Sequence, residues 1–184
     1  MVDPTTQLSE HLTASTFTKS STAIRNGINN SLPDEMLDRA KGYAENFYEK
    51  IYQLFGGDAS IHSGWRCQAL NNALPGSSKT SDHMRANAID MDYNGKMSLP
   101  KAFETILKSD VKYKQLMIEG ITAANPKGGW IHGAYDSDFS PENQKMEIKI
   151  VHFVKDPSNP DGPLKPQYLA VSLADALQWC EENA

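Results

Sequence analysis

The chain has only two cysteines, Cys67 and Cys180, among its 184 residues. Two cysteines are too few for a cysteine-rich zinc site, so a metal centre in this protein would have to use histidine and carboxylate ligands. The two thiols stand far apart in the sequence, and a disulfide between them would require an oxidising compartment. We therefore expect two separate thiols.

The chain also lacks long apolar runs and clusters of basic residues. No stretch approaches the roughly 20 apolar residues of a membrane helix, and the opening MVDPTTQLSEHLTASTF has neither the basic start nor the apolar centre of a secretory signal. The net charge of −5 does not suit a surface that neutralises phosphates. We expect no nucleic-acid partner, no membrane partner and a cytoplasmic location.

What is present is the composition of a globular protein, with 39% hydrophobic and 22% charged residues. The length suits a single domain over residues 1–184 with one hydrophobic core. Residues 1–30, rich in Ser, Thr and Asn, are expected to form an N-terminal lead-in of loops and short turns. Residues 136–184 are expected to add a C-terminal strand and a helix. We expect a monomer. No feature of the sequence determines the oligomeric state.

Hydrophobic periodicity predicts an α+β fold. Apolar residues at steps of three and four predict a long amphipathic helix within residues 31–57, ended by Gly56 and Gly57. Shorter helices are expected over residues 67–73, 98–109 and 172–183. Alternation and β-propensity predict strands, which in chain order are 60–66, 87–93, 113–119, 128–135 and 146–154. These elements together predict a small antiparallel sheet with helices packed on one side.

The first candidate ligands are His83 and Asp90 in SSKTSDHMRANAIDMDY. Alternation in residues 87–93 places Ile89 and Met91 on the core face, so Asp90 points away from the core. On one continuous strand, residues seven apart lie on opposite faces, so His83 and Asp90 converge only if the chain turns between them. The segment MRAN is a plausible place for that turn. The alternative is a polar strand face that is simply solvated.

His132 in GGWIHGAY shares a strand face with Trp130 and Ala134. A histidine beside a tryptophan on a strand is often a partly buried structural residue, and that alternative stays open. Two histidines and one carboxylate would leave the fourth position of a tetrahedral zinc ion for a water molecule. Such a metal lowers the pKa of its bound water and polarises a carbonyl group. The remaining histidines carry weaker arguments: His11, His62 and His152.

Three sequence blocks together resemble the zinc D-Ala-D-Ala carboxypeptidase family of peptidoglycan peptidases. The family pattern S-G-[YW]-R, a short helix, a Gly/Ser loop and S-x-H-x-x-G-x-A-x-D is similar to SGWRCQALNNALPGSSKTSDHMRANAIDMD. QLMIE resembles its Q-L-I-x-E strand, and WIH its W-[IV]-H strand. The N-terminal lead-in resembles that of small phage-type or prophage-type members, so the likeness covers about residues 8–135.

This resemblance implies a hedgehog/DD-peptidase-like fold and a zinc ion bound by His83, Asp90 and His132. It also implies that Arg66 contacts the carboxylate or backbone of the substrate, and that Ser81 is a polar group close to the metal. An arginine suits a planar anion because its guanidinium donates two parallel hydrogen bonds. The alternative for Arg66 is a structural ion pair.

Two positions depart from the family pattern. Ala86 stands where the family has glycine, and Gly129 stands three residues before the second histidine, where many relatives carry the catalytic carboxylate. Glu119 matches the glutamate of the Q-L-I-x-E block, and we expect it to be the general base. The alternatives for this role are Asp82 and Asp136.

The resemblance implies a zinc metallopeptidase that hydrolyses the peptide stems of peptidoglycan as a D-Ala-D-Ala carboxypeptidase does. Two alternatives stay open. One is an endopeptidase of the phage lysin type that cuts L-Ala–D-Glu or cross-bridge bonds, and the other is a non-catalytic cell-wall-binding or virion structural domain. On the phage reading, the protein stays in the cytoplasm until lysis or is carried on the virion.

Overall fold

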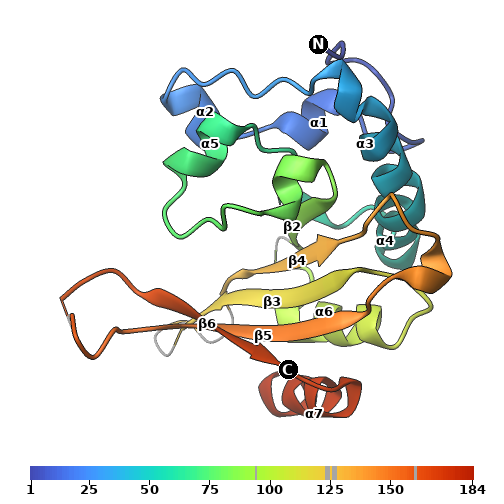
Figure 1. Ribbon diagram of the computed structural model, residues 1–184. Helices are drawn as coiled ribbons and strands as arrows, with labels where there is room; N and C mark the ends of the chain where they lie inside the picture. Colours follow the sequence, from blue (N-terminus) through green and yellow to red (C-terminus); the bar gives the residue numbers. More distant parts are fainter. Residues whose placement is uncertain (94, 123–124, 126–127, 160) are drawn as a thin grey trace.

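The computed structural model describes residues 1–93, 95–122, 125, 128–159 and 161–184. It has the predicted α+β architecture, with helices and a six-stranded sheet in the order β1-β2-β4-β3-β5-β6 (Figure 1). The strands are β1 (Ser60–Ser63), β2 (Ala88–Asp92), β3 (Gln115–Ile121), β4 (Trp130–Ala134), β5 (Glu147–Val154) and β6 (Lys165–Ala170). Neighbouring strands are antiparallel except β3 and β5, which pair in parallel. The prediction of an antiparallel sheet therefore fails at that one pairing.

The predicted helices are present. Residues 31–57 contain one continuous helical stretch, which ends where Gly56 adopts a left-handed φ of 61°. It consists of α3 (Leu37–Tyr43), the π-helical turn η2 (Ala44–Tyr48) and α4 (Glu49–Phe55). The other helices are α1 (Ala14–Thr18), α2 (Ser21–Arg25), α5 (Gln68–Ala73), α6 (Leu99–Leu107) and α7 (Leu173–Asn183). Single turns complete the set: η1 (Asp34–Met36), η3 (Asp82–Arg85) and η4 (Pro141–Asn143).

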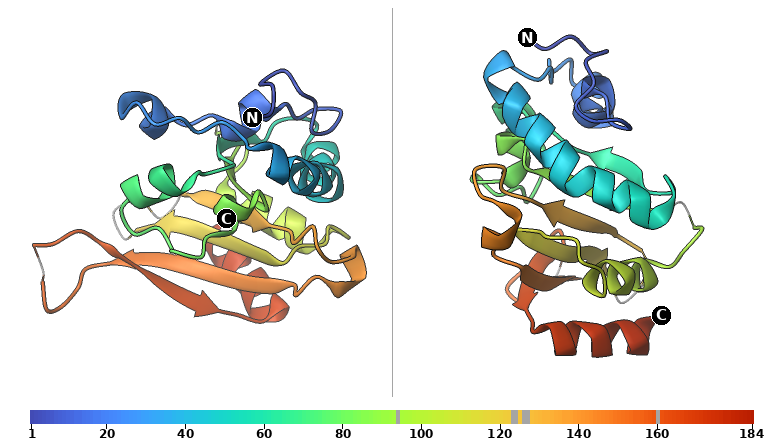
Figure 2. Two further views of the ribbon diagram at one scale, coloured as in Figure 1. Left: turned by 45° about the horizontal axis from the view of Figure 1, so that its top comes forward. Right: turned by 90° about the vertical axis from the view of Figure 1, so that its right-hand side faces the viewer.

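One face of the sheet carries the main hydrophobic core. The strand residues on it are buried and aliphatic, and they include Ile89, Met91, Leu116, Ile118, Ile131, Ile148 and Ile150. The stretch α3–α4, together with α6 and α7, covers this face (Figure 2). The hydroxyl of Tyr43 donates a 2.9 Å hydrogen bond to the carbonyl of Gly133, which ties the long helical stretch to β4. The helices α3–α4, α6 and α7 thus pack on one side of the sheet, as predicted, whereas η3 lies against the other side.

Two segments differ from the sequence prediction. Residues 1–30 contain α1 and α2, which Thr13 and Ser20 cap by accepting hydrogen bonds from backbone amides. The C-terminal segment contains β6, a second strand that the sequence does not predict and that pairs with β5 to form a projecting arm (Figure 1). β6 is an edge strand and contains Pro166, which weakens the β signal of its sequence.

Two further expectations concern the thiols and the membrane. Cys67 and Cys180 are free, as expected. Within the described residues, no helix combines the length and apolarity that crossing a membrane requires. Part of the connection between β3 and β4, residues 123–124 and 126–127, lies outside the described residues.

The contact between Gly133 and Phe47 gives a test of this packing. A Cβ atom at Gly133 would stand 2.3 Å from Cζ of the fully buried Phe47 ring. We expect Gly133→Ala to lower the free energy of unfolding by about 1–3 kcal/mol, because the ring must shift in a filled core. Urea unfolding of the chelator-treated protein measures this loss. In a Phe47→Leu background the same substitution should cost less, and an equal cost in both backgrounds would contradict the packing described.

Candidate metal centre

Three buried side chains from three elements converge on the sheet face opposite the main core. Asp90 on β2 pairs directly with His132 on β4, and His83 comes from η3. Asp90 Oδ1 lies 3.2 Å from His83 Nε2 and 2.9 Å from His132 Nδ1, and the two ring nitrogens are 3.2 Å apart. In the described part of the chain, this is the group of histidine, cysteine and acidic residues whose geometry could hold a metal ion.

The predicted turn between His83 and Asp90 is present as η3. It ends at Ala86, whose φ of 56° is left-handed, a conformation that glycine adopts more easily than alanine. The backbone amide of Asn87 then donates to the carbonyl of Asp82 and closes the turn. Ala86 thus keeps the backbone shape that the family pattern assigns to glycine, at the cost of local strain.

A backbone carbonyl orients the ring of His83. Its Nδ1 lies 2.7 Å from the carbonyl oxygen of Gly64, which only accepts hydrogen bonds, so Nδ1 carries the hydrogen and Nε2 faces Asp90 and His132. Gly64 has no room for a side chain, because a Cβ atom there would stand 2.3 Å from the carbonyl oxygen of Phe17. The glycine of the SGWR block is therefore required by packing against α1.

The N-terminal lead-in holds the same segment from behind. The carbonyl of Phe17 accepts a 2.8 Å hydrogen bond from the amide of Trp65. The buried Asn30 side chain donates to the carbonyls of Thr18 and Trp65 and accepts from the amide of Cys67. These bonds fix the chain on both sides of Arg66, so residues 8–30 support the cluster although none of them belongs to it.

The donor chemistry of the cluster fits a cation such as zinc. With the hydrogen of neutral His83 on Nδ1, its Nε2 presents a lone pair to the Asp90 carboxylate 3.2 Å away. A hydrogen on His132 Nδ1 can satisfy its own contact with Asp90, but it cannot satisfy the His83–Asp90 contact as well. A cation between the three atoms would be attracted by all of them, and two imidazoles with one carboxylate form a zinc ligand set.

The protonation states also suit metal binding. Burial lowers the pKa of His83, which favours the neutral imidazole that can act as a ligand. Burial alone would raise the pKa of Asp90, but His83 and His132 together lower it well below its ordinary value. Burial would lower the pKa of His132, yet its hydrogen bond to Asp90 and the charge of Asp90 raise it. Protonation and metal binding therefore compete for His132.

Arg66 contacts the cluster directly. Its Nη2 pairs with Oδ2 of Asp90, the oxygen that does not face the histidines, and its Nε donates a 2.8 Å hydrogen bond to Ser63 Oγ. The structure thus contains the ion pair that the sequence left as the alternative for this residue. The predicted contact between Arg66 and substrate stays a prediction.

Glu119 lies beside the cluster on the same face of the sheet. Met117 is the β3 partner of His132, and Glu119, two residues further along β3, is a diagonal neighbour of that histidine. Burial raises the pKa of Glu119, the positive charge of His132 opposes this, and the negative charge of Asp90 adds to it. A carboxyl group with a raised pKa beside a metal site suits general-base catalysis at neutral pH.

Gly129, which stands where many relatives carry a carboxylate, leaves no space for one. Its φ is 103°, and a Cβ atom there would stand 1.9 Å from the carbonyl oxygen of Glu119. The backbone of Glu119 therefore occupies the space that a side chain at position 129 would need. With the β3 backbone in this place, position 129 must be glycine, and the carboxylate on this face of the sheet comes from Glu119.

The other predicted site residues are engaged elsewhere. Asp82 forms a 2.6 Å salt bridge with Lys114, and Asp136 accepts a 3.2 Å hydrogen bond from Asn87 Nδ2. Asp136 also lies 3.5 Å from Arg39. Ser81 precedes η3 and is half-buried, and its position near a metal stays a prediction.

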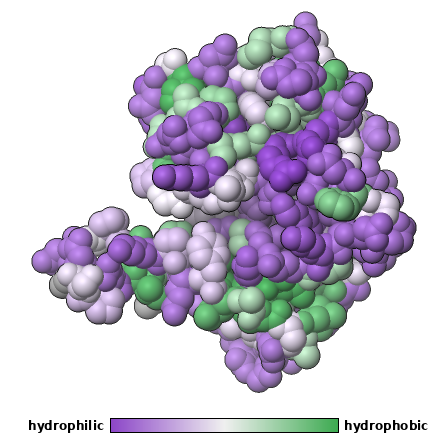
Figure 3. Space-filling model, viewed as in Figure 1, coloured by the Kyte–Doolittle hydropathy of each residue, from purple (hydrophilic) through white to green (hydrophobic). Residues whose placement is uncertain are grey.

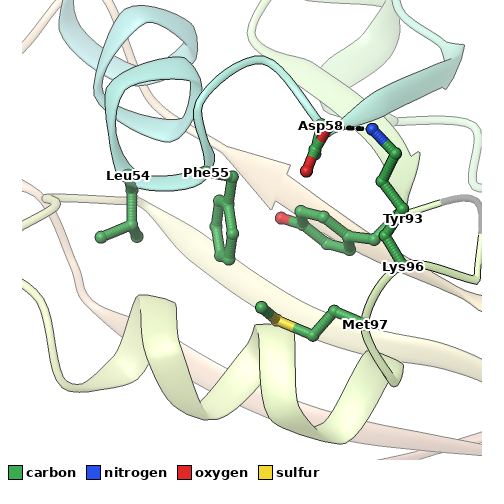
Figure 4. A pocket seen from close by; sticks show the side chains of 6 residues that line it. All are labelled: Leu54, Phe55, Asp58, Tyr93, Lys96 and Met97. Atoms are coloured by element: carbon green, nitrogen blue, oxygen red, sulfur yellow. Dashed lines mark hydrogen bonds and ion pairs between the residues drawn. The ribbon is translucent and has the colours of Figure 1, made fainter.

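The remaining histidines and a small pocket lie outside the cluster. His11 pairs with Glu49 at 2.8 Å, and His62 pairs with Asp92 at 2.8 Å. A pocket of about 210 Å³ opens near the end of α4, where an Asp58–Lys96 ion pair lies over apolar side chains (Figure 4). These side chains are Leu54, Phe55, Tyr93 and Met97. The side chains that line this pocket include no histidine, so they do not form a histidine metal site.

Comparison with known proteins gives one match. A family model described as Peptidase M15 matches residues 10–132, which is more than half of the chain. The match spans the lead-in, η3, β2 and β4 up to His132. No curated protein and no solved structure matches the chain.

The cluster predicts the metal content of two histidine variants. We expect the wild-type protein to bind about one zinc ion per chain and His83→Ala to bind none, because only two protein ligands remain in the variant. His62→Ala should retain it, because His62 is half exposed and contacts Asp92 rather than Asp90. Elemental analysis after dialysis measures both, and urea unfolding in chelator checks that the variants fold. A tightly bound zinc ion in His83→Ala would contradict the assignment.

Proposed function

The chain belongs to the peptidase M15 family, and we propose that it is a zinc-dependent peptidase that hydrolyses the peptide stems of bacterial peptidoglycan, as D-Ala-D-Ala carboxypeptidases do. Family membership implies a metallopeptidase. The substrate and the bond that is cut are part of the proposal. So is delivery to the cell wall by lysis or on a virion, which the phage-type lead-in supports.

One observation carries the proposal. His83, Asp90 and His132 bring their ligand atoms within 4.8 Å of one another, and Glu119 lies on the same sheet face one strand away. A hydrolytic metal site needs both parts, a set of three protein ligands and a base close to it. Asp90, His132 and Glu119 come from the neighbouring strands β2, β4 and β3, which hold side chains more rigidly than loops do, and η3 adds His83.

The residues divide the reaction between them. When bound by His83, Asp90 and His132, zinc supplies a Lewis acid that polarises the scissile carbonyl and makes water more acidic. Glu119 takes a proton from the attacking water and returns it to the leaving amine. The burial that raises the pKa of Glu119 makes it a stronger base than an exposed glutamate, which suits this proton transfer.

Arg66 is proposed to bind the substrate. Its contacts to Asp90 and Ser63 use Nη2 and Nε, so further N–H groups of the guanidinium are available for a peptide carbonyl or carboxylate. Its ion pair with Asp90 also keeps that carboxylate ionised and oriented, which supports the ligand role of Asp90. Ser81 would add a polar contact near the same place.

An endopeptidase that cuts L-Ala–D-Glu or cross-bridge bonds is the second candidate. A carboxypeptidase needs a positive group that ends its pocket and binds the terminal carboxylate. Arg66 contacts the ligand Asp90, so the group proposed to bind substrate lies beside the metal ligands themselves, which favours a substrate that continues past the metal. The two candidates share the ligands and the base, and they differ in the substrate segment beyond the cleaved bond.

Substitution of the base tests the chemistry. Glu119→Gln should retain one zinc ion per chain and lower peptidoglycan hydrolysis by about 10²–10⁴-fold, because the amide cannot accept the proton. Release of new amino groups and of free D-Ala from purified cell wall measures the rate. Asp82→Asn and Asp136→Asn, whose carboxylates are held by Lys114 and Asn87, should hydrolyse cell wall at close to the wild-type rate.

Two results would oppose this proposal. Wild-type hydrolysis by Glu119→Gln would mean that another group is the base. A zinc-loaded wild-type protein that binds cell wall but releases no amine from it would be a non-catalytic binding module.

A further inference from the structure

The sheet face that carries the cluster continues well beyond it. His132 pairs with Met117 on β3, Met117 with Lys149 on β5, and Lys149 with Ala170 on β6. One pleat further along, Trp130 pairs with Glu119, and Val151 on β5 pairs with Tyr168 on β6. These four residues lie on the same face as the candidate metal centre, and the β3–β5 register shifts between Glu119 and Val151, just after the Ile118–Ile150 pair.

This part of the face is partly exposed to solvent, because Trp130 and Phe153 are half-buried while Val151 is fully buried. The helices that pack against these strands, α6 and α7, lie on the other side of the sheet (Figure 1). The space-filling view shows a recess between the upper part of the molecule and the β5–β6 arm (Figure 3). Tyr168, which pairs with Val151 at the edge of the sheet, is 50% exposed.

This sheet face carries aromatic side chains. The rings of Trp130 and Phe153 meet edge to face with their centroids 6.2 Å apart, and both are half-buried. Val151, fully buried, lies beside Tyr168 in the register of β5 and β6. Burial raises the pKa of Tyr168 and the charge of Glu119 raises it further, so the phenol lies within electrostatic reach of the proposed base. We call Trp130, Phe153 and Tyr168 the aromatic shelf.

The charges on this face are largely neutralised. Lys149 forms a 3.0 Å salt bridge with Glu147, and Glu147 also accepts a hydrogen bond from Gln115. The exposed binding surface is therefore aromatic carbon, with the tyrosine hydroxyl as a polar group. Such a surface suits a peptide chain with small aliphatic side chains better than it suits a polyanion.

The dimensions of the sheet set the length of the ligand. Neighbouring strands lie about 4.8 Å apart, so the distance from β4, which carries His132, to β6 is roughly 14 Å. An extended peptide advances about 3.3–3.6 Å per residue. A chain of about four residues is therefore needed to reach from the metal ligands to Tyr168.

We propose that the aromatic shelf is an extended substrate-binding surface, which binds the part of a peptide about four residues beyond the cleaved bond. This inference rests on the proposed peptidase function and makes it more specific. A dipeptide terminus would not reach Tyr168, whereas a stem peptide joined to its cross-bridge would cover the whole shelf. The shelf thus favours cleavage inside longer peptides.

Peptides that share one scissile bond but differ in length test the shelf. The series runs from two to six residues and is extended on either side of that bond. For the wild-type protein, kcat/KM should rise on the order of tenfold once the chain reaches about four residues on one side, mainly through KM. Tyr168→Ala should lose this rise and leave the shortest peptide unaffected.

Two variants act as controls. Tyr168→Phe keeps the ring and should keep the length dependence. Phe139→Ala removes another exposed aromatic side chain, outside the shelf, and should also keep it. Zinc content equal to that of the wild-type protein in every variant excludes an indirect effect on the cluster.

A binding experiment separates failure of the shelf from failure of the proposed function. Zinc-loaded Glu119→Gln should bind the six-residue peptide about tenfold more tightly than the Glu119→Gln/Tyr168→Ala double variant, by calorimetry. If the wild-type protein hydrolyses no peptide but this difference in binding is observed, the peptidase proposal is wrong and the peptide-binding role of the shelf is supported. Equal length dependence in wild type and Tyr168→Ala would overturn the shelf. The shelf would also be overturned if the wild-type protein were a dimer that Tyr168→Ala dissociates and if kcat/KM did not depend on peptide length. This face would then be the contact with a second copy of the chain.

Discussion

The pairing of Asp90 with His132 across β2 and β4 is the constraint on which the candidate site depends. In antiparallel strands a shift by one residue would move every side chain to the other face. The buried aliphatic residues beside them, Ile89 and Ile131, exclude that shift because they must face the helices. The hydrophobic core therefore sets the position of two proposed ligands, and η3 needs only to turn His83 onto them.

The parts of the site that follow from local periodicity could be predicted from the sequence. Alternation within residues 87–93 places Asp90 away from the core, and the same argument groups His132 with Trp130. The turn before β2 is predictable because His83 and Asp90 could not otherwise meet. Ala86 adopts the left-handed backbone conformation at the end of this turn. Alanine in place of glycine therefore adds backbone strain without changing the shape of the turn.

The parts that depend on tertiary contacts could not be predicted. The ion pair between Arg66 and Asp90 joins residues 24 apart in sequence, and the orientation of His83 depends on a backbone carbonyl, which no side-chain pattern reveals. The glycine of SGWR is a signal for close packing, but only the structure identifies Phe17 as the neighbour. β6, which carries Tyr168, cannot be predicted from the sequence because its short segment contains Pro166 and alternates poorly.

The location of zinc in the loaded protein tests the account most directly. An anomalous-difference map at the zinc absorption edge should show one ion, bound by Nε2 of His83, Nδ1 of His132 and a carboxylate oxygen of Asp90 at about 2.0–2.2 Å. Glu119 should lie close to the ion without binding it. Zinc found instead at the His62–Asp92 pair or the His11–Glu49 pair, with the three proposed ligands still in contact with one another, would contradict the account.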